Sequence, residues 1–212
     1  MAKTVLINGC SYAVGWNPDK WFEGYNIVNL AKNGGSNRRA MRTTIEWTLL
    51  NGNPDYVIIP ITFLDRNETF FDSNVNNAKY VDINSGFYDS HPMGQITEQF
   101  LGVEHTSARL DKFLTDLIMF TSFLQLRNIP FIMFNMCIRN MPSLLDDNTL
   151  KVKAEYLNSC PGIIDLTFIG NKYLGDNGAT PAGNDINFDV EVRHHDVNNY
   201  HILEKYLNDY RK

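Results

Sequence analysis

The chain has 212 residues, of which 43% are hydrophobic and 20% are charged, and its formal net charge is −5 at pH 7. This composition is typical of a globular protein and excludes a disordered one. The length is sufficient for one domain with a substantial core. The acidic balance argues against a nucleic-acid partner, because nonspecific binding of that kind needs a basic surface.

The apolar segments alternate in kind along the chain. Short continuous runs predict strands at residues 4–7, 25–30, 55–62, 129–134 and 162–166. Apolar residues spaced by three and four predict helices at residues 38–50, 107–127, 149–157 and 198–210. Strands that alternate with helices in this way are typical of a parallel sheet covered on both faces. We therefore predict an α/β fold, a three-layer α/β/α sandwich around a central parallel sheet of about five strands.

Two features interrupt this alternation. Pro60 and Pro130 fall in predicted strands, where each removes a ladder hydrogen-bond donor. Residues 66–106 contain no convincing helix and carry six aromatic residues among Asn, Asp and Ser. In a single domain spanning 1–212, an insertion this long is typical of a lid, a binding loop or a small β subdomain. A surface hairpin that buries its own aromatic side chains is the alternative.

The three cysteines, Cys10, Cys137 and Cys160, fit neither a disulfide framework nor a zinc site. The chain enters its first strand without a signal-peptide pattern. No apolar run approaches the length of about 20 residues that spans a bilayer. We expect a cytoplasmic protein without a membrane span.

Candidate catalytic residues follow the strand ends. Ser11 comes two residues after Gly9 at the end of the first strand, where parallel sheets bind ligands. A simple turn or helix-capping role is the alternative for this serine. Gly34 follows the second strand, where glycines can turn backbone N–H groups toward a developing oxyanion. His194 and His195 precede the last predicted helix, and a histidine there could reach Ser11.

These segments resemble known motifs of one enzyme family. Residues 9–15 (Gly-Cys-Ser-Tyr-Ala-Val-Gly) resemble the first block of SGNH (GDSL-like) hydrolases, with cysteine in place of the family's aspartate. Asn29 and Gly34 are similar to the second block. Residues 35–38 and 42–47 resemble its continuation in bacteriophage-encoded SGNH-type proteins. The resemblance covers residues 1–70 well and the last 20 residues loosely.

The resemblance implies a flavodoxin-like SGNH hydrolase fold and a serine-dependent hydrolase of the esterase or O-deacetylase type. Ser11 would attack the carbonyl of a small ester or an acylated carbohydrate while a histidine removes its proton. No cofactor and no metal is implied. For a phage-encoded protein, the host cytoplasm or the virion would be its location.

The oxyanion donors depart from the family pattern. Gly34 can supply a backbone N–H, but Leu64 stands where the third block has an asparagine donor. Thr62, Arg66 or another group must substitute for it, because loss of one donor typically costs about 10²–10³ in turnover.

The histidine block departs as well. His195 precedes His201 by the family's spacing of six residues, which selects His195 as general base. The orienting acid is missing from its usual place three residues before His195. Glu191 lies three residues before His194, so a shifted register makes His194 the base, and Asp189 is a further candidate acid.

Two other classes of function stay open. Acidic and histidine side chains between residues 191 and 201 could ligate a metal, which would make the protein a metal-dependent hydrolase. Alternatively, the protein is a binding or virion component with an impaired SGNH site, in which residues 66–106 bind carbohydrate.

Overall fold

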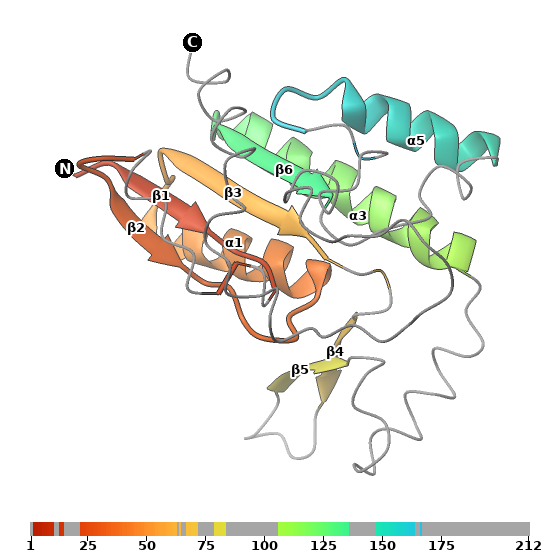
Figure 1. The fold of residues 1–212 in the computed structure, drawn as a ribbon, viewed down its shortest axis with the longest axis horizontal. Helices are drawn as coiled ribbons and strands as arrows, with labels where there is room; N and C mark the ends of the chain where they lie inside the picture. The colour runs from red at the N-terminus through yellow and green to blue at the C-terminus, as the bar shows by residue number, and fades with distance from the viewer. Residues whose placement is uncertain are drawn as a thin grey trace, which may run out of the picture.

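The main feature of the fold is a parallel sheet. The computed structural model describes residues 2–10, 13–14, 22–62, 64, 67–71, 79–83, 106–135, 147–163 and 166. The sheet contains β1 (Thr4–Ile7), β2 (Asn26–Asn29), β3 (Tyr56–Ile61) and β6 (Phe131–Asn135) in the order β2-β1-β3-β6. The helices of the described residues are α1 (Asn37–Asn51), α3 (Thr106–Leu126) and α5 (Asn148–Asn158) (Figure 1). The predicted α/β class with a parallel sheet is confirmed.

The predicted fifth strand is present in reduced form. Ile163 forms an isolated parallel bridge with Met133 of β6, and the Met133 N–H donates to the Gly162 carbonyl at 2.8 Å. This segment therefore continues the sheet beyond β6. The predicted helix at residues 198–210 lies outside the described residues.

Pro60 lies within a central strand without breaking a hydrogen bond of the sheet. Ile58 directs its carbonyl to β1, where it accepts from the Asn8 N–H at 3.1 Å. Two residues further on, Pro60 faces the same side, but the pairing of β1 with β3 ends at Ile58. No hydrogen bond between β1 and β3 is therefore lost because Pro60 lacks an N–H. Pro130 precedes β6 rather than lying within it, and its carbonyl accepts from the Val57 N–H at 2.9 Å.

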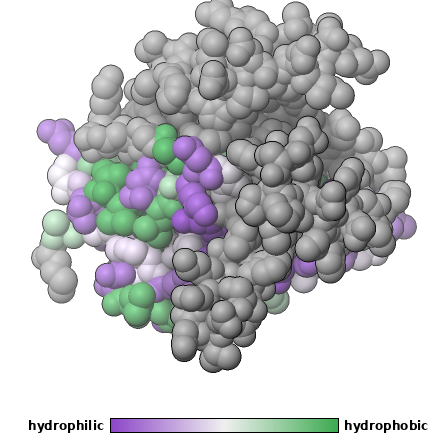
Figure 2. Space-filling model, turned by 90° about the horizontal axis from the view of Figure 1, so that it is seen from below, coloured by the Kyte–Doolittle hydropathy of each residue, from purple (hydrophilic) through white to green (hydrophobic). Residues whose placement is uncertain are grey.

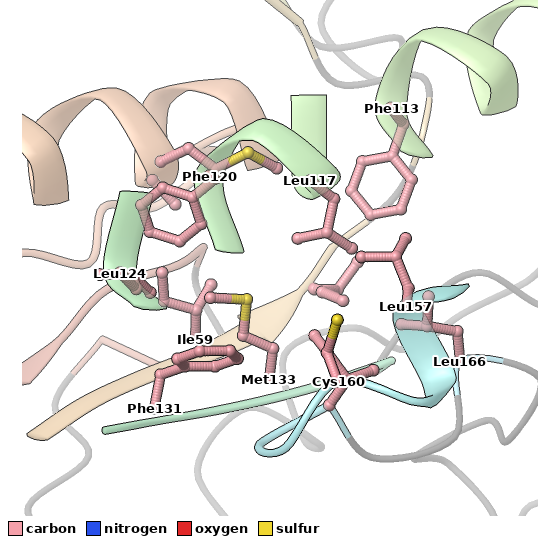
Figure 3. Close-up of a cluster of buried hydrophobic side chains, with 14 of the residues drawn as sticks. Ile59, Phe113, Leu117, Phe120, Leu124, Phe131, Met133, Leu157, Cys160 and Leu166 are labelled. Carbon is pink, nitrogen blue, oxygen red and sulfur yellow. The ribbon is translucent and has the colours of Figure 1, made fainter. Parts of the chain in front are cut away.

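The three helices cover one face of the sheet. Their apolar sides meet alternate residues of β1, β3 and β6 in a single buried cluster (Figure 3). Figure 3 labels side chains from α3 (Phe113, Leu117, Phe120 and Leu124) above side chains from the sheet (Ile59, Phe131 and Met133). Each of these helices lies in a connection that moves across the sheet in the same direction, from the β2 edge toward the β6 edge. Right-handed crossovers in one direction place all three helices on the same face.

The opposite face of the sheet is buried too. Val5, Ile7, Ile58 and Ile132 on this face are fully buried in a second apolar cluster. The cluster also contains Ala13 and Phe22, from the connection between β1 and β2. That connection runs in the opposite direction along the sheet, and a right-handed crossover therefore assigns it to this face.

An antiparallel ladder lies apart from the main sheet. β4 (Asn67–Phe71) pairs with β5 (Lys79–Ile83), and Figure 1 shows the pair beyond the end of β3. The remainder of the predicted insertion at 66–106 lies outside the described residues. A lid or binding role for this insertion stays a prediction.

The described surface mixes apolar and polar groups. Figure 2 shows hydrophobic and hydrophilic side chains side by side on the face seen from below. Apolar atoms are common on folded surfaces, so this face by itself identifies no partner. None of the helices in the described part of the chain is long and apolar enough to cross a membrane.

Candidate functional site

The chain segments that leave β1 and β2 contact each other at the carboxyl edge of the sheet. The Leu30 N–H donates to the Ile7 carbonyl at 2.8 Å, and the Lys32 N–H donates to the Gly9 carbonyl at 3.2 Å. A Cβ atom on Gly35 would lie 3.1 Å from the Gly9 carbonyl oxygen. The first two sequence blocks are therefore adjacent in space, at the edge where parallel sheets bind ligands.

Gly9 occupies a restricted position at the end of β1. Its φ of 143° is one that L side chains rarely adopt. A Cβ atom there would lie 3.2 Å from Cγ of Pro60 and 3.3 Å from Cβ of Ala13. The backbone conformation therefore favours glycine at this point, and the close packing leaves little room for a side chain.

A turn begins immediately after Gly9. The Ala13 N–H donates to the Cys10 carbonyl at 2.9 Å, and Asn29 Nδ2 donates to the Ala13 carbonyl at 2.8 Å. The Asn29 Oδ1 also accepts from the Ala31 N–H at 2.9 Å. Asn29 thus connects the end of β2 to the turn that follows β1. Cys10 is fully buried, as expected for a packed residue rather than an exposed nucleophile.

Gly34 lies in the turn that contacts Gly9. The Gly35 N–H donates to the Lys32 carbonyl at 2.9 Å, and Gly34 at the third turn position has a φ of 73°. A positive φ at this position is characteristic of a type II turn and favours glycine. Donation of the Gly34 N–H to an oxyanion stays a prediction.

Thr62 is buried, and its backbone is already hydrogen-bonded to one side chain. The Thr62 N–H donates to Asn37 Oδ1 at 2.7 Å, while Asn37 Nδ2 donates to the Thr62 carbonyl at 2.9 Å. An oxyanion role for Thr62 would therefore have to use its hydroxyl. Leu64 packs against the main apolar cluster, and so the position of the family's asparagine donor faces the core.

Helix α1 contacts the ends of the neighbouring strands through polar side chains near its start. Asn37 binds Thr62 after β3, as described above, and Arg39 Nη1 donates to the Leu30 carbonyl after β2 at 3.1 Å. Asn8, after β1, contacts the helix at Ala40, Thr43 and Thr44. Sequence reasoning did not predict the contacts of Asn8 or of Asn37, which was considered with Ser36 as a possible cap of this helix; the structure gives the cap to Ser36. The available signal was an asparagine directly after a fully apolar run and another beside a capping serine.

An ion pair joins α1 to β4. Arg42 donates from Nε and Nη2 to the two carboxylate oxygens of Glu68 at 2.7 and 2.6 Å, and from Nη1 to Glu46 at 2.7 Å. The hydrogen bond to Glu68 raises the pKa of Arg42 above its usual range, against the opposing effect of burial. Arg42 thus joins α1 to β4 through Glu68.

The remaining predicted site residues lie outside the described part of the chain. They are Ser11, Arg66, Glu191, His194 and His195. The residues considered for the metal alternative, between 191 and 201, lie outside it too. The structure therefore brings together the segments that flank Ser11 and the turn around Gly34, and the catalytic assignments stay predictions.

Comparison with known proteins defines the class of fold. No described family matches the sequence, and no curated protein matches it. The crystal structure of TesA is similar over 97% of this chain and 99% of TesA, with 11% identity and a TM-score of 0.50. At this identity the likeness concerns the fold alone, and the chain has an α/β fold of the TesA kind.

Two further solved structures resemble the chain more weakly. One is from Bacteroides fragilis and is described as an acylhydrolase; it has 15% identity, covers 98% of this chain and 87% of that protein, and has a TM-score of 0.47. The other is the psychrotrophic esterase EstA from Pseudoalteromonas, with 15% identity, coverage of 97% and 99%, and a TM-score of 0.42.

Proposed function

We propose that the protein is a serine-dependent hydrolase of carboxylic esters, of the SGNH type found in bacteriophages. Ser11 is the nucleophile, and His195, or His194 in the shifted register, is the general base. The observation that carries this proposal is the contact between the segments after β1 and β2 at Gly9. That contact joins the two blocks of the SGNH resemblance at one edge of an α/β sheet.

The reaction is acyl transfer to Ser11 followed by hydrolysis. The histidine accepts the proton of the serine hydroxyl as the oxygen attacks the ester carbonyl, and it then protonates the departing alcohol. The backbone N–H groups of Ser11 and Gly34 stabilise the tetrahedral oxyanion. A water molecule, activated by the same histidine, releases the acid. Glu191 or Asp189 orients the imidazole.

The electrostatics of α1 support an oxyanion at this edge. Ser36 caps the helix by accepting from the Arg39 N–H at 3.1 Å, and the first turn contains no acidic residue. The positive end of the helix dipole is therefore not neutralised from within its own first turn. This helix end directly follows the Gly34–Gly35 turn, so it favours negative charge close to the proposed oxyanion site.

The test is hydrolysis of p-nitrophenyl acetate and butyrate by wild type, Ser11→Ala, His195→Ala and His194→Ala. Ser159→Ala, at the end of α5, is the matched control because its hydroxyl donates to the Tyr156 carbonyl. We expect preference for the shorter ester and a loss of at least about a thousandfold in kcat for Ser11→Ala. A fluorophosphonate should label wild type and not Ser11→Ala. Equal hydrolysis by wild type and Ser11→Ala would refute the proposal.

A specific observation favours a second candidate, a carbohydrate-binding protein without turnover. Leu64 packs against the core where the family has an oxyanion donor, and the Thr62 N–H is bound to Asn37. These features remove two groups that could have stabilised the oxyanion from the third strand. Unchanged glycan affinity in Ser11→Ala, together with a wild type that hydrolyses no ester, would support this candidate.

A further inference from the structure

Asn8 is a fully buried polar residue at the end of β1, and the proposed chemistry does not use it. Its two Nδ2 hydrogens face three acceptors, the Ala40 carbonyl at 2.9 Å, Thr43 Oγ1 at 2.8 Å and Thr44 Oγ1 at 3.0 Å, so one hydrogen is shared between two of them. All three acceptors belong to α1. The Thr43 hydroxyl in turn donates to the Arg39 carbonyl at 2.8 Å, which leaves its oxygen oriented to accept from Asn8.

The other end of the same amide binds the next residue. Asn8 Oδ1 accepts from the Gly9 N–H at 2.9 Å. The Asn8 backbone N–H donates to the Ile58 carbonyl of β3 at 3.1 Å. A single buried residue therefore connects the sheet, helix α1 and Gly9. An apolar side chain of similar size would fill the space and make none of these connections.

We propose that Asn8 is a positioning residue that fixes Gly9 and the Cys10–Ala13 turn relative to α1. Where the chain hydrolyses esters, this connection sets the position of the segment that carries the nucleophile, so the catalytic part of the inference rests on the proposed function. The geometric part, the position of Gly9 relative to α1, does not depend on the proposed function. Gly9 has little room to adjust, because Pro60 and Ala13 lie close to where its Cβ would be.

The first measurement is amide hydrogen exchange by NMR in wild type, Asn8→Leu and Thr48→Val. Thr48 is the matched control, since it is buried in α1 and its hydroxyl donates to the Thr44 carbonyl at 2.8 Å. In Asn8→Leu we expect exchange at Gly9 and Ala13 to become faster by about tenfold or more relative to Val57 in β3. Thr48→Val should leave this ratio unchanged.

The second measurement is steady-state hydrolysis of p-nitrophenyl acetate by the same variants. Asn8→Leu should lower kcat by about 10- to 100-fold, because a small displacement of a reacting group has an effect of this size. KM should change by less than about threefold, as expected when binding of the ground state is retained. Thr48→Val should retain its kcat even where its thermal midpoint falls as far as that of Asn8→Leu.

Several outcomes would overturn the proposal. Exchange at Gly9 and Ala13 that rises only in step with Val57 would indicate general destabilisation, and a kcat loss equal to that of Thr48→Val would do the same. Should Asn8→Leu fail to fold, Thr44→Val removes one acceptor and must produce the same selective exchange, to a smaller extent. A wild type that hydrolyses no ester refutes the proposed function alone, while the exchange ratio still decides the role of Asn8.

Discussion

Two glycines with almost the same φ angle have very different surroundings. Gly52 ends α1 with a φ of 91°, and no atom lies within 4 Å of where its Cβ would be. Gly162 has a φ of 93°, but its Cβ would lie 2.1 Å from the Phe131 carbonyl oxygen. Only Gly162 is therefore required by packing as well as by conformation. Its close approach to β6 allows the chain to extend the sheet at Ile163.

This difference predicts unequal effects of the same substitution. Gly52→Ala should lower the free energy of unfolding by about 1–3 kcal/mol, the cost of an L residue in this backbone region, which is essentially restricted to glycine. Gly162→Ala should lower it by about 1–3 kcal/mol more, since the backbone of β6 must move. Urea denaturation of both variants measures the difference. Equal losses would contradict the packing argument.

Asn37 acts on the backbone of another segment rather than on a side chain. Its amide accepts from and donates to Thr62, at a point where β3 has ended and where the described part of the chain has no strand that pairs with it. The side chain therefore takes the place of a neighbouring strand for one residue. Buried backbone groups without partners are strongly disfavoured, and so this contact holds the segment after β3 in place.

Asn37→Ala should lower the free energy of unfolding by about 2–4 kcal/mol, because both Thr62 backbone groups lose their partner in a buried site. Asn51→Ala is the control at the other end of the same helix. Its Nδ2 donates to the Trp47 carbonyl in an exposed position, and we expect a change within about 0.5 kcal/mol. Chemical denaturation distinguishes the two, and losses of similar size would show that the Thr62 contact is unimportant.

At the scale of elements, α1 has two functions, and its buried face contributes to both. Its apolar side chains, such as Ala40 and Met41, join the core against the sheet. Its polar side chains contact the segments that follow β1, β2 and β3, and Arg42 reaches β4. Because parallel strands all end at one edge of a sheet, a single helix beginning near that edge can contact several strand ends.

The Arg42–Glu68 pair gives a prediction at this scale. The Glu68 side chain is only 3% exposed, so Arg42→Met leaves a buried carboxylate without its guanidinium partner. We expect a loss of about 3–5 kcal/mol and faster amide exchange in β4. Glu46→Gln removes a contact to a side chain that is 49% exposed and should cost no more than about 0.5 kcal/mol.

The result that would contradict this prediction is Arg42→Met with wild-type exchange in β4. In that case contacts other than the ion pair would hold the β4–β5 pair against α1. A double variant, Arg42→Met with Glu68→Leu, provides a further control. Replacing both partners with apolar groups should recover most of the lost stability, because no buried charge then remains.

At the scale of the whole molecule, the described helices and one face of the sheet are stabilised by a single apolar cluster. Leu117 on α3 is 1% exposed within it, whereas Leu126 on the same helix is 85% exposed. Leu117→Ala should lower the free energy of unfolding by about 2–5 kcal/mol through lost burial and a cavity. Leu126→Ala should change it by less than about 0.5 kcal/mol. Thermal or urea unfolding provides the comparison, and equal losses would contradict this assignment of the core.

The sequence by itself determined the elements that depend on local patterns. Continuous apolar runs identified β1, β2, β3 and β6 to within a few residues, because strands of a parallel sheet covered on both faces are apolar along their length. The spacing of apolar residues by three and four identified α1, α3 and α5 to within a few residues. The same reasoning expected segments near Gly9 and Gly34 to meet, since the ends of parallel strands share one edge.

Only the tertiary structure decided which polar groups are partners. Nothing local in the chain pairs Asn8 with Thr44, Asn37 with Thr62, or Arg42 with Glu68. Each pair is separated by at least 25 residues and forms only when a helix and a strand end are packed together. Likewise, Pro60 was compatible with a central strand because β1 ends before it, a fact of strand register. Hydrophobic burial follows the sequence pattern directly. The hydrogen bonds of buried polar groups instead depend on which distant residues the packed structure places next to them.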